Sequence, residues 1–237
     1  MEYAGICKHL HRIEKNLMAK RAGRKRQNLI WHLLVYILAV IGAITLIVMM
    51  VVALKTFVFA KKIVTTPPEI TEDYLTVNPY SRPGAALGEV KGIVIHYTAN
   101  PGTSAENNRS YFEGLSTSQE TYASSHYIID VSGEIIQCIP LTEIAYASND
   151  RNSDTIAIEC CHLDESGVFT TATYDKLVHL VAYLMGSYDL TIDDVIRHYD
   201  VNGKNCPRYF VENPEAWEQF KTDVTAYIKE NGERVVK

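Results

Sequence analysis

Residues 92–96 (GIVIH) form a short apolar run that begins at a glycine and ends at a histidine. A run of this length beside a turn-forming residue is typical of a buried strand. Residues 155–161 (TIAIECC) and residues 195–198 (VIRH) have the same character, and residues 126–139 read as a β-hairpin. Polar side chains at the ends of neighbouring strands can meet at one edge of a sheet, so these runs indicate both a sheet and the place of a site.

Helical patterns alternate with these strands along the chain. Residues 104–115 and residues 174–188 repeat apolar side chains at the spacing of one helix face. The last predicted helix has Asn213 as its N-cap, Pro214 in its first position and Gly232 beyond its end. The alternation predicts an α/β domain, with a central mixed β-sheet flanked by helices.

The charge of the chain is divided unevenly between its two parts. Residues 1–62 hold 11 of the 23 Lys and Arg but only two acidic residues, whereas residues 63–237 hold 12 basic and 26 acidic residues. The second part therefore has a net charge of −14. Binding to phosphate groups needs the opposite sign, so we expect no nucleic-acid partner.

The five cysteines are odd in number and have no repeated spacing, so they do not indicate a disulfide framework. Cys160 and Cys161 are adjacent, and neighbours on a strand point to opposite faces. We expect Cys138 and one of this pair to be small buried hydrophobic residues.

Residues 29–54 contain no formally charged side chain, and they predict one transmembrane helix. At 1.5 Å per residue the segment would be about 39 Å long, more than the ~30 Å hydrocarbon core of a bilayer. A cleaved signal peptide is the alternative, with residues 58–60 (VFA) as a tolerable cleavage site. The apolar part of a signal peptide is usually only about 7–15 residues, so the length favours the membrane helix.

The charges that flank this segment predict its orientation. Eight Lys and Arg precede it and three closely follow it, so residues 1–28 are expected in the cytoplasm and the remainder outside the cell membrane. Prolines at residues 67 and 68 cannot continue a helix. We therefore expect a linker over residues 55–74 and a globular domain over residues 75–237.

Three side chains could hold a metal ion at the edge of the predicted sheet. His96 and His198 end two strands, and Cys206 follows His198 by eight residues across a loop that contains Gly203. A catalytic zinc site keeps three protein ligands and leaves one position for water. Two histidines and a distant cysteine also occur without a metal, so the spacing by itself leaves a structural role open.

Four stretches resemble the family of N-acetylmuramoyl-L-alanine amidases, which includes phage-endolysin amidases and peptidoglycan recognition proteins. They are residues 93–98 (IVIHYT), 124–130 (SSHYIID), 155–159 (TIAIE) and 197–207 (RHYDVNGKNCP), and the resemblance covers roughly residues 75–225. The resemblance implies that residues 75–237 form a zinc amidase domain. It implies hydrolysis of the amide between N-acetylmuramic acid and L-alanine in peptidoglycan.

The same resemblance implies that His96, His198 and Cys206 hold Zn²⁺, and that Glu159 and Lys204 are catalytic. A carboxylate can take a proton from water and pass it to the leaving amine, and an ammonium group can stabilise an oxyanion. Glu159 could instead pair with an arginine, and Lys204 could be a solvated loop residue.

Other residues beside the proposed ligands are candidates for substrate contacts. Tyr97, Asn100 and Arg197 are adjacent to them in sequence, and the family pattern makes His126 a residue of the site wall rather than a ligand. Two departures from the family stand out. Ser125 replaces a tyrosine that some branches use in catalysis, and residues 145–148 (AYAS) lack a histidine that many relatives carry.

The sequence leaves two rival functions open. Some relatives have lost zinc and only recognise peptidoglycan, although this chain keeps both the cysteine and the loop lysine. A zinc hydrolase acting on another amide is the second alternative. We expect peptidoglycan and the membrane as partners, and a monomer.

Overall fold

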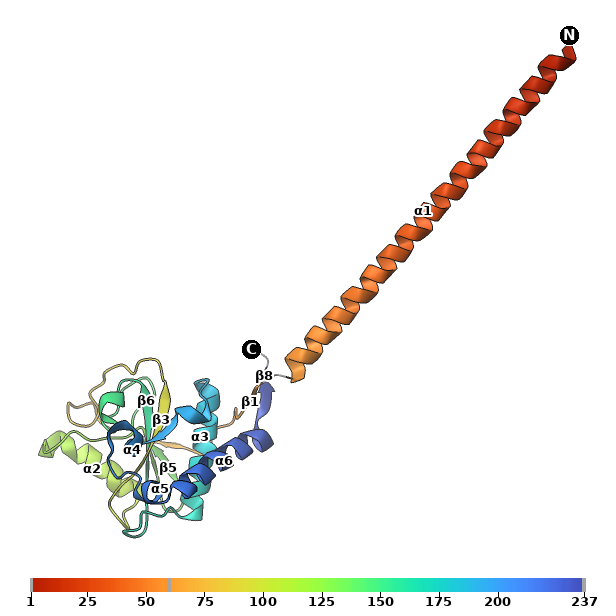
Figure 1. Cartoon of the computed structure of the whole chain (residues 1–237). Helices are drawn as coiled ribbons and strands as arrows, with labels where there is room; N and C mark the ends of the chain where they lie inside the picture. Colours follow the sequence, from red (N-terminus) through yellow and green to blue (C-terminus); the bar gives the residue numbers. More distant parts are fainter. Residues whose placement is uncertain (1, 59–60, 236–237) are drawn as a thin grey trace. The chain divides into compact units, whose positions relative to one another are not determined.

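The computed structural model describes residues 2–58 and 61–235, which divide into two units considered separately (Figure 1). The first contains one long helix, α1 (Glu2–Val58), and the second, from Lys61 to Val235, contains every other element. The predicted transmembrane segment at residues 29–54 lies within α1, so its helical character is confirmed.

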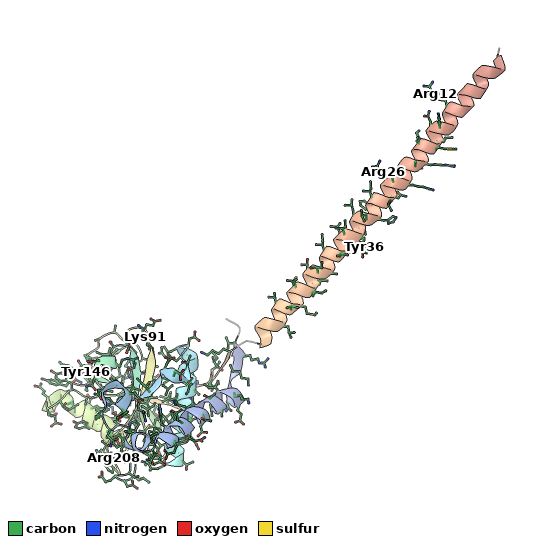
Figure 2. All side chains as sticks on the ribbon, viewed as in Figure 1. Arg12, Arg26, Tyr36, Lys91, Tyr146 and Arg208 are labelled. Carbon is green, nitrogen blue, oxygen red and sulfur yellow. The ribbon has the colours of Figure 1, made fainter. Side chains whose placement is uncertain are left out.

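The helix α1 is long and apolar enough to cross a membrane over Lys15–Val52. Its apolar side chains between residues 29 and 52 are largely exposed, and Figure 2 shows the described side chains projecting outward along the helix. A surface so rich in exposed apolar groups is unfavourable in water and suits contact with lipid.

The second unit is built on a six-stranded mixed sheet, as the sequence predicted. Only β4 and β5 pair antiparallel; the other neighbouring strands are parallel. A separate two-stranded antiparallel sheet joins β1 (Lys61–Ile63) to β8 (Glu233–Val235). The strand order of the large sheet is β2 (Thr71–Glu72), β5 (Ile135–Gln137), β4 (Tyr127–Ile129), β6 (Thr155–Cys160), β3 (Gly92–Tyr97) and β7 (Val195–Arg197).

Helices cover both faces of this sheet, which explains the continuous apolar runs of its central strands. Figure 1 shows α2 (Ala105–Ser118) on one side and α3 (Thr171–Ser187) with α6 (Pro214–Asn231) on the other. Parallel strands covered on both faces need apolar side chains in both directions. All six residues of β3 are buried accordingly.

The remaining helical elements are short and lie around the ends of the strands. They are the 3₁₀ helices η1 (Asn149–Arg151) and η2 (Ile192–Asp194) and the α-helices α4 (His198–Asn202) and α5 (Arg208–Glu212).

The buried cysteines follow from the same two-sided packing. Cys160 packs in the cluster that includes α3 and α6, and Cys161 packs in the cluster that includes α2. The sequence predicted that one of this pair would be buried; both are, because each face of the sheet is covered. Cys138 is buried as predicted, and none of the three forms a disulfide.

The second unit begins earlier in the chain than the sequence indicated. We expected a linker up to residue 74, but β1 pairs with β8 and β2 adds to the large sheet beside β5. Short strands at a sheet edge leave little hydrophobic pattern, so residues 61–74 resemble a linker in sequence although they belong to the compact unit.

A partly buried hydrogen-bond chain ties the segment of residues 75–83, called the lead-in segment below, to the central strand β6. The Arg82 guanidinium donates to both carboxylate oxygens of Glu143, at 2.8 and 2.7 Å, and to the carbonyl of Leu75. The Glu143 carbonyl lies 3.0 Å from His126 Nε2, and His126 Nδ1 accepts from the Ala157 amide at 3.0 Å. These side-chain bonds add to the backbone bonds that continue from β2, such as the one from the Leu75 amide to the Cys138 carbonyl at 2.9 Å.

Replacing Arg82 with Met is expected to lower the free energy of unfolding of the second unit by about 1–3 kcal/mol, because Glu143 then loses its paired donors. Trp217 fluorescence during urea denaturation in a nonionic detergent would measure this. The Arg82 bond lowers the pKa of Glu143, so the pair's contribution is full above the ordinary carboxyl range and is lost as the pH falls through the lowered pKa.

The matched control is Glu218→Gln, because Glu218 pairs with Lys221 but is 66% exposed, whereas Glu143 is only 19% exposed. An exposed pair of this kind contributes about 0–1 kcal/mol. Equal losses in the two variants at neutral pH would contradict the role given to Arg82.

Candidate metal centre and catalytic cleft

Three buried side chains converge where β3 and β7 end. The candidate ligand atoms of His96, His198 and Cys206 all lie within 4.8 Å of one another. His96 belongs to β3, and His198 is the first residue of α4, directly after the neighbouring strand β7. The two imidazole rings meet edge to face, with centroids 4.6 Å apart.

The loop after α4 returns the cysteine to these histidines. The Tyr199 amide donates to the Cys206 carbonyl at 2.9 Å, which closes the loop. Gly203 ends α4 with a φ of 80°, a left-handed conformation that glycine adopts without steric cost. The sequence predicted that His96, His198 and Cys206 would come together. The turn at Gly203 brings Cys206 back to the two histidines.

The two nitrogens of each histidine ring, Nδ1 and Nε2, have different surroundings. Cys206 Sγ lies 3.8 Å from His96 Nδ1, and His198 Nδ1 is buried with no hydrogen-bond partner. Both Nε2 atoms are engaged: His198 Nε2 lies 2.8 Å from Asn149 Oδ1, and His96 Nε2 lies 3.2 Å from Ser148 Oγ. The Asn149 oxygen can only accept, so His198 carries its proton on Nε2 and directs a lone pair from Nδ1 into the site.

Burial sets the protonation of these groups. It lowers the pKa of His96 well below its usual value and lowers that of His198 to about 4, so both rings are neutral at physiological pH. Burial also raises the pKa of Cys206 to about 12. A nearby cation favours the thiolate, which is the ligand form. Two neutral imidazoles, one sulfur and an unpartnered buried nitrogen fit a metal ion.

Glu159 stands beside this group because of the pairing of β3 with β6. The register places it opposite His96, and its Oε2 atom is buried without a hydrogen-bond partner. Burial raises the pKa of Glu159 to about 8, against the opposing charge of Lys204. Within residues 2–58 and 61–235 no arginine forms an ion pair with it, so the arginine partner considered from the sequence is not found there.

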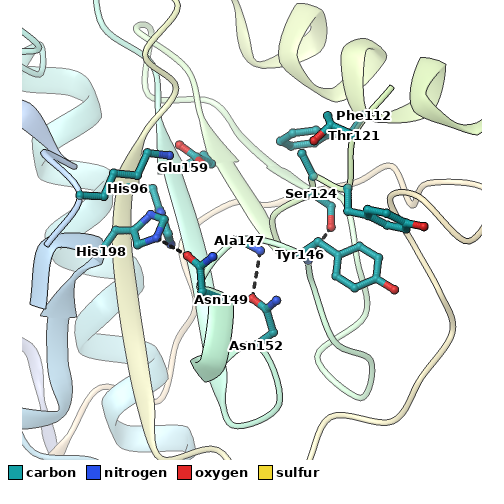
Figure 3. Close-up of a pocket in the computed structure, with 13 residues that line it drawn as sticks. His96, Phe112, Thr121, Ser124, Tyr146, Ala147, Asn149, Asn152, Glu159 and His198 are labelled. Atoms are coloured by element: carbon teal, nitrogen blue, oxygen red, sulfur yellow. Dashed lines mark hydrogen bonds between the residues drawn. The ribbon is translucent and has the colours of Figure 1, made fainter. Parts of the chain in front are cut away.

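These groups open into a polar cleft with a volume of about 440 Å³. Figure 3 shows His96, His198 and Glu159 on one side of it and Tyr146 on the other, with Asn149 and Asn152 between them. The lining also includes Lys204, Phe112, Thr121, Tyr122, Ala123, Ser124 and Ala147.

Two of the residues expected to touch substrate lie outside this cleft. Tyr97 is buried and stacks on His162, with ring centroids 5.0 Å apart. Asn100 is exposed, and its carbonyl accepts from the Thr103 hydroxyl at 2.7 Å. Both residues are close to His96 in the sequence, but neither side chain lines the cleft.

His126 and Arg197 are likewise held by structural contacts. Both ring nitrogens of His126 are engaged with backbone groups, and the side chain is 1% exposed. Arg197 pairs with Asp200 at 2.7 Å, donates to the Phe210 carbonyl at 2.9 Å and lies over the Trp217 ring. The structure gives these two residues supporting roles, and neither lines the cleft.

The loop at residues 145–152 supplies site residues that the sequence analysis missed. Asn152 Oδ1 accepts from the amides of Ala147 and Ser148, and Asn149 adopts a φ of 52°, which asparagine tolerates better than most residues. In the sequence, the only indication that this loop belongs to the site was its departure from the family pattern at residues 145–148. A run of Ser, Asn and Asp between strands predicts only a turn, not contacts with distant imidazoles.

Asn149→Ala is expected to weaken divalent metal binding about 10–100-fold, because His198 loses the acceptor that fixes its tautomer and ring orientation. Competition between the full chain and a chromophoric chelator would measure the affinity. Asn100→Ala is the matched control, since Asn100 is exposed and lies outside the cleft. Unchanged affinity in Asn149→Ala would show that the ring needs no such support.

Comparison with solved structures places this fold among amidase domains. The catalytic domain of XlyA superposes with a TM-score of 0.57 at 27% identity, covering 66% of this chain and 99% of that domain. PlyL superposes with a TM-score of 0.57 at 26% identity, covering 66% of this chain and 97% of that one.

Sequence comparison agrees. The chain is 37% identical over 188 residues to the N-acetylmuramoyl-L-alanine amidase BlyA of Bacillus subtilis (strain 168), covering 70% of this chain and 49% of BlyA. It is 35% identical over 173 residues to the amidase CwlL of Bacillus licheniformis, covering 68% of this chain and 48% of CwlL. The chain thus spans about half the length of these curated relatives. A model of the family matches residues 86–209, and the chain belongs to the N-acetylmuramoyl-L-alanine amidase family.

Proposed function

We propose that this protein hydrolyses the amide between N-acetylmuramic acid and L-alanine in peptidoglycan, with Zn²⁺ held by His96, His198 and Cys206. The observation that carries the proposal is the convergence of three ligand atoms within 4.8 Å beside a buried, unpartnered carboxylate. BlyA and CwlL, its relatives, are named for this amidase activity.

The donor set supports zinc in particular. Nitrogen and sulfur ligands suit this ion, and three of them leave a fourth position open. When bound, the ion would polarise a water molecule and the substrate carbonyl. The protein's contribution is to keep both imidazoles neutral, to place His96 Nδ1 3.8 Å from the Cys206 sulfur and to leave His198 Nδ1 without another partner.

Glu159 is suited to move the proton in this reaction. Its carboxylate can accept a proton from the attacking water and then donate it to the leaving amine. Burial raises its pKa to about 8, near neutral pH, where one group can serve both steps. Lys204 lies at the same cleft and can donate to the carbonyl oxygen as negative charge develops there.

Glu159→Gln is expected to retain zinc and to lose at least about 100-fold in the release of stem peptides from purified cell wall, because the amide cannot accept the proton. Metal content by atomic absorption and peptide release by chromatography would measure both effects. Glu230→Gln, an exposed substitution on α6, serves as the control. Retained activity in Glu159→Gln would remove this carboxylate from the mechanism.

A binding-only role is the rival, and the site argues against it. A module that only recognised peptidoglycan would gain nothing from a buried carboxylate without a hydrogen-bond partner, which costs stability. Digesting peptidoglycan and identifying the new termini separates the two. It also separates cleavage of this amide from cleavage of another one.

We further propose that α1 anchors the protein in the cell membrane as a single span, with the N-terminus in the cytoplasm. The supporting observations are the apolar helix and the excess of Lys and Arg before residue 29. The catalytic unit would then lie outside the membrane and act on peptidoglycan close to it.

The anchored form is expected to remain in the membrane fraction after alkaline carbonate extraction, and protease added to intact protoplasts should digest the catalytic unit. A variant lacking residues 2–58 should leave that fraction, because the apolar helix is gone. Protection from external protease would reverse the proposed orientation. A shortened, released protein from the unaltered gene would favour the signal-peptide alternative.

A further inference from the structure

A second hollow adjoins the catalytic cleft and shares two tyrosines with it. Tyr122 and Tyr146 line both spaces. The second hollow has a volume of about 500 Å³, and its other lining residues are Val77, Asn78, Pro79 and Pro83. The two tyrosines therefore form a ridge, with the candidate metal centre on one side and this hollow on the other.

The ridge presents an aromatic face that is held in place. Tyr122 is 61% exposed, yet its ring stacks on Tyr80 with centroids 5.1 Å apart and meets Tyr146 edge to face at 5.6 Å. The backbone is fixed as well: the Ala123 amide donates to the Tyr80 carbonyl, and the Ser124 amide donates to that of Tyr146. An exposed ring fixed in this way is ready to bind a ligand at small cost in conformational entropy.

The floor of the hollow is rigid and uncharged. Asn78 uses its side chain within its own turn, donating to Thr76 and Ser81 and accepting from the amides of Tyr80 and Ser81. The remaining lining is valine, proline and tyrosine, and no charged side chain belongs to it. Residues 77–83 lie just before residues 86–209, the part of the chain that the family model matches.

We propose that this hollow binds a neutral sugar ring of the glycan strand, next to the N-acetylmuramic acid whose amide lies in the cleft. The inference rests on the proposed function, since it extends the same substrate. A pyranose ring has C–H groups on its flat faces that pack on an aromatic ring, while its hydroxyl groups stay in water. A stem peptide carries carboxylates, for which this uncharged lining offers no partner.

The position of the ridge indicates how the glycan strand would run across the site. The reacting amide lies among His96, Glu159 and His198, and the glycan passes over Tyr122 into the hollow of residues 77–83. Figure 3 shows Tyr146 across the cleft from these catalytic groups, and Tyr146 also lines the second hollow. The protein should therefore prefer muramoyl peptides that carry additional sugars over a single muramoyl peptide.

The test compares two substrates with the same stem peptide, one on a single N-acetylmuramic acid and one on a tetrasaccharide of the glycan. Because Tyr122 lines the cleft as well as the hollow, Tyr122→Ala in the full chain is expected to lower kcat/KM on both substrates, and roughly tenfold more on the tetrasaccharide substrate than on the single-sugar substrate. Tyr111→Ala is the control, because Tyr111 is 47% exposed on α2 and lines neither space.

A titration without any cleavable amide separates the inference from the proposed function. An N-acetylglucosamine tetramer should bind the Glu159→Gln chain, and binding should disappear when Tyr122→Ala is added. If the parent chain cleaves both substrates and Tyr122→Ala lowers kcat/KM equally on the two, the proposed sugar site is wrong while the amidase function stands. If neither substrate is cleaved, the proposed function fails, and tetramer binding alone supports or overturns the sugar site. Binding of free stem peptide, instead of the tetramer, at Tyr122 would also overturn it.

Discussion

The parallel pairing of β3 with β6 and β7 is the constraint on which the rest of the structure depends. It places His96 opposite Glu159 on one side and brings the strand that leads to His198 alongside on the other. A shift of one residue would turn every side chain of β3 to the opposite face of the sheet. Since apolar clusters cover both faces, the shift would send His96 into a hydrophobic core. The packing of the sheet therefore also positions the site.

At this edge of the sheet, the site contains buried polar atoms that lack hydrogen-bond partners. Glu159 and His198 each have a buried polar atom without a partner, which is a cost that most buried groups avoid. Hydrogen bonds around the site help to offset this cost in stability. Ser148 and Asn149 bind the Nε2 atoms of the two histidines, and Asn152 holds the loop at residues 145–152 in place. Glu159 and His198 both line the cleft beside His96, so these unsatisfied groups mark a place where a ligand can bind.

The lead-in segment supports the site, although it has little regular secondary structure. Arg82 and Glu143 join it to His126, and His126 joins it to β6. A histidine expected in the wall of the site is thus a brace behind it. The same segment carries the wall of residues 77–83 beside the tyrosine ridge, so one set of partly buried hydrogen bonds supports both the catalytic strand and the adjoining hollow.

The sequence by itself determined the apolar strands, the main helices, the long apolar N-terminal helix and the three metal-ligand candidates, because each is a local pattern of period, capping or motif. It identified Glu159 and Lys204 only through a family resemblance. Only the tertiary structure decided that Asn149 and Ser148 hold the imidazoles, that Tyr122 and Tyr146 form a ridge, and that residues 61–74 join the compact unit. These features depend on contacts between segments that lie far apart in the sequence, such as Asn149 and His198, which are 49 residues apart. Local sequence patterns do not encode such contacts, because backbone pairing and burial of the whole chain create them.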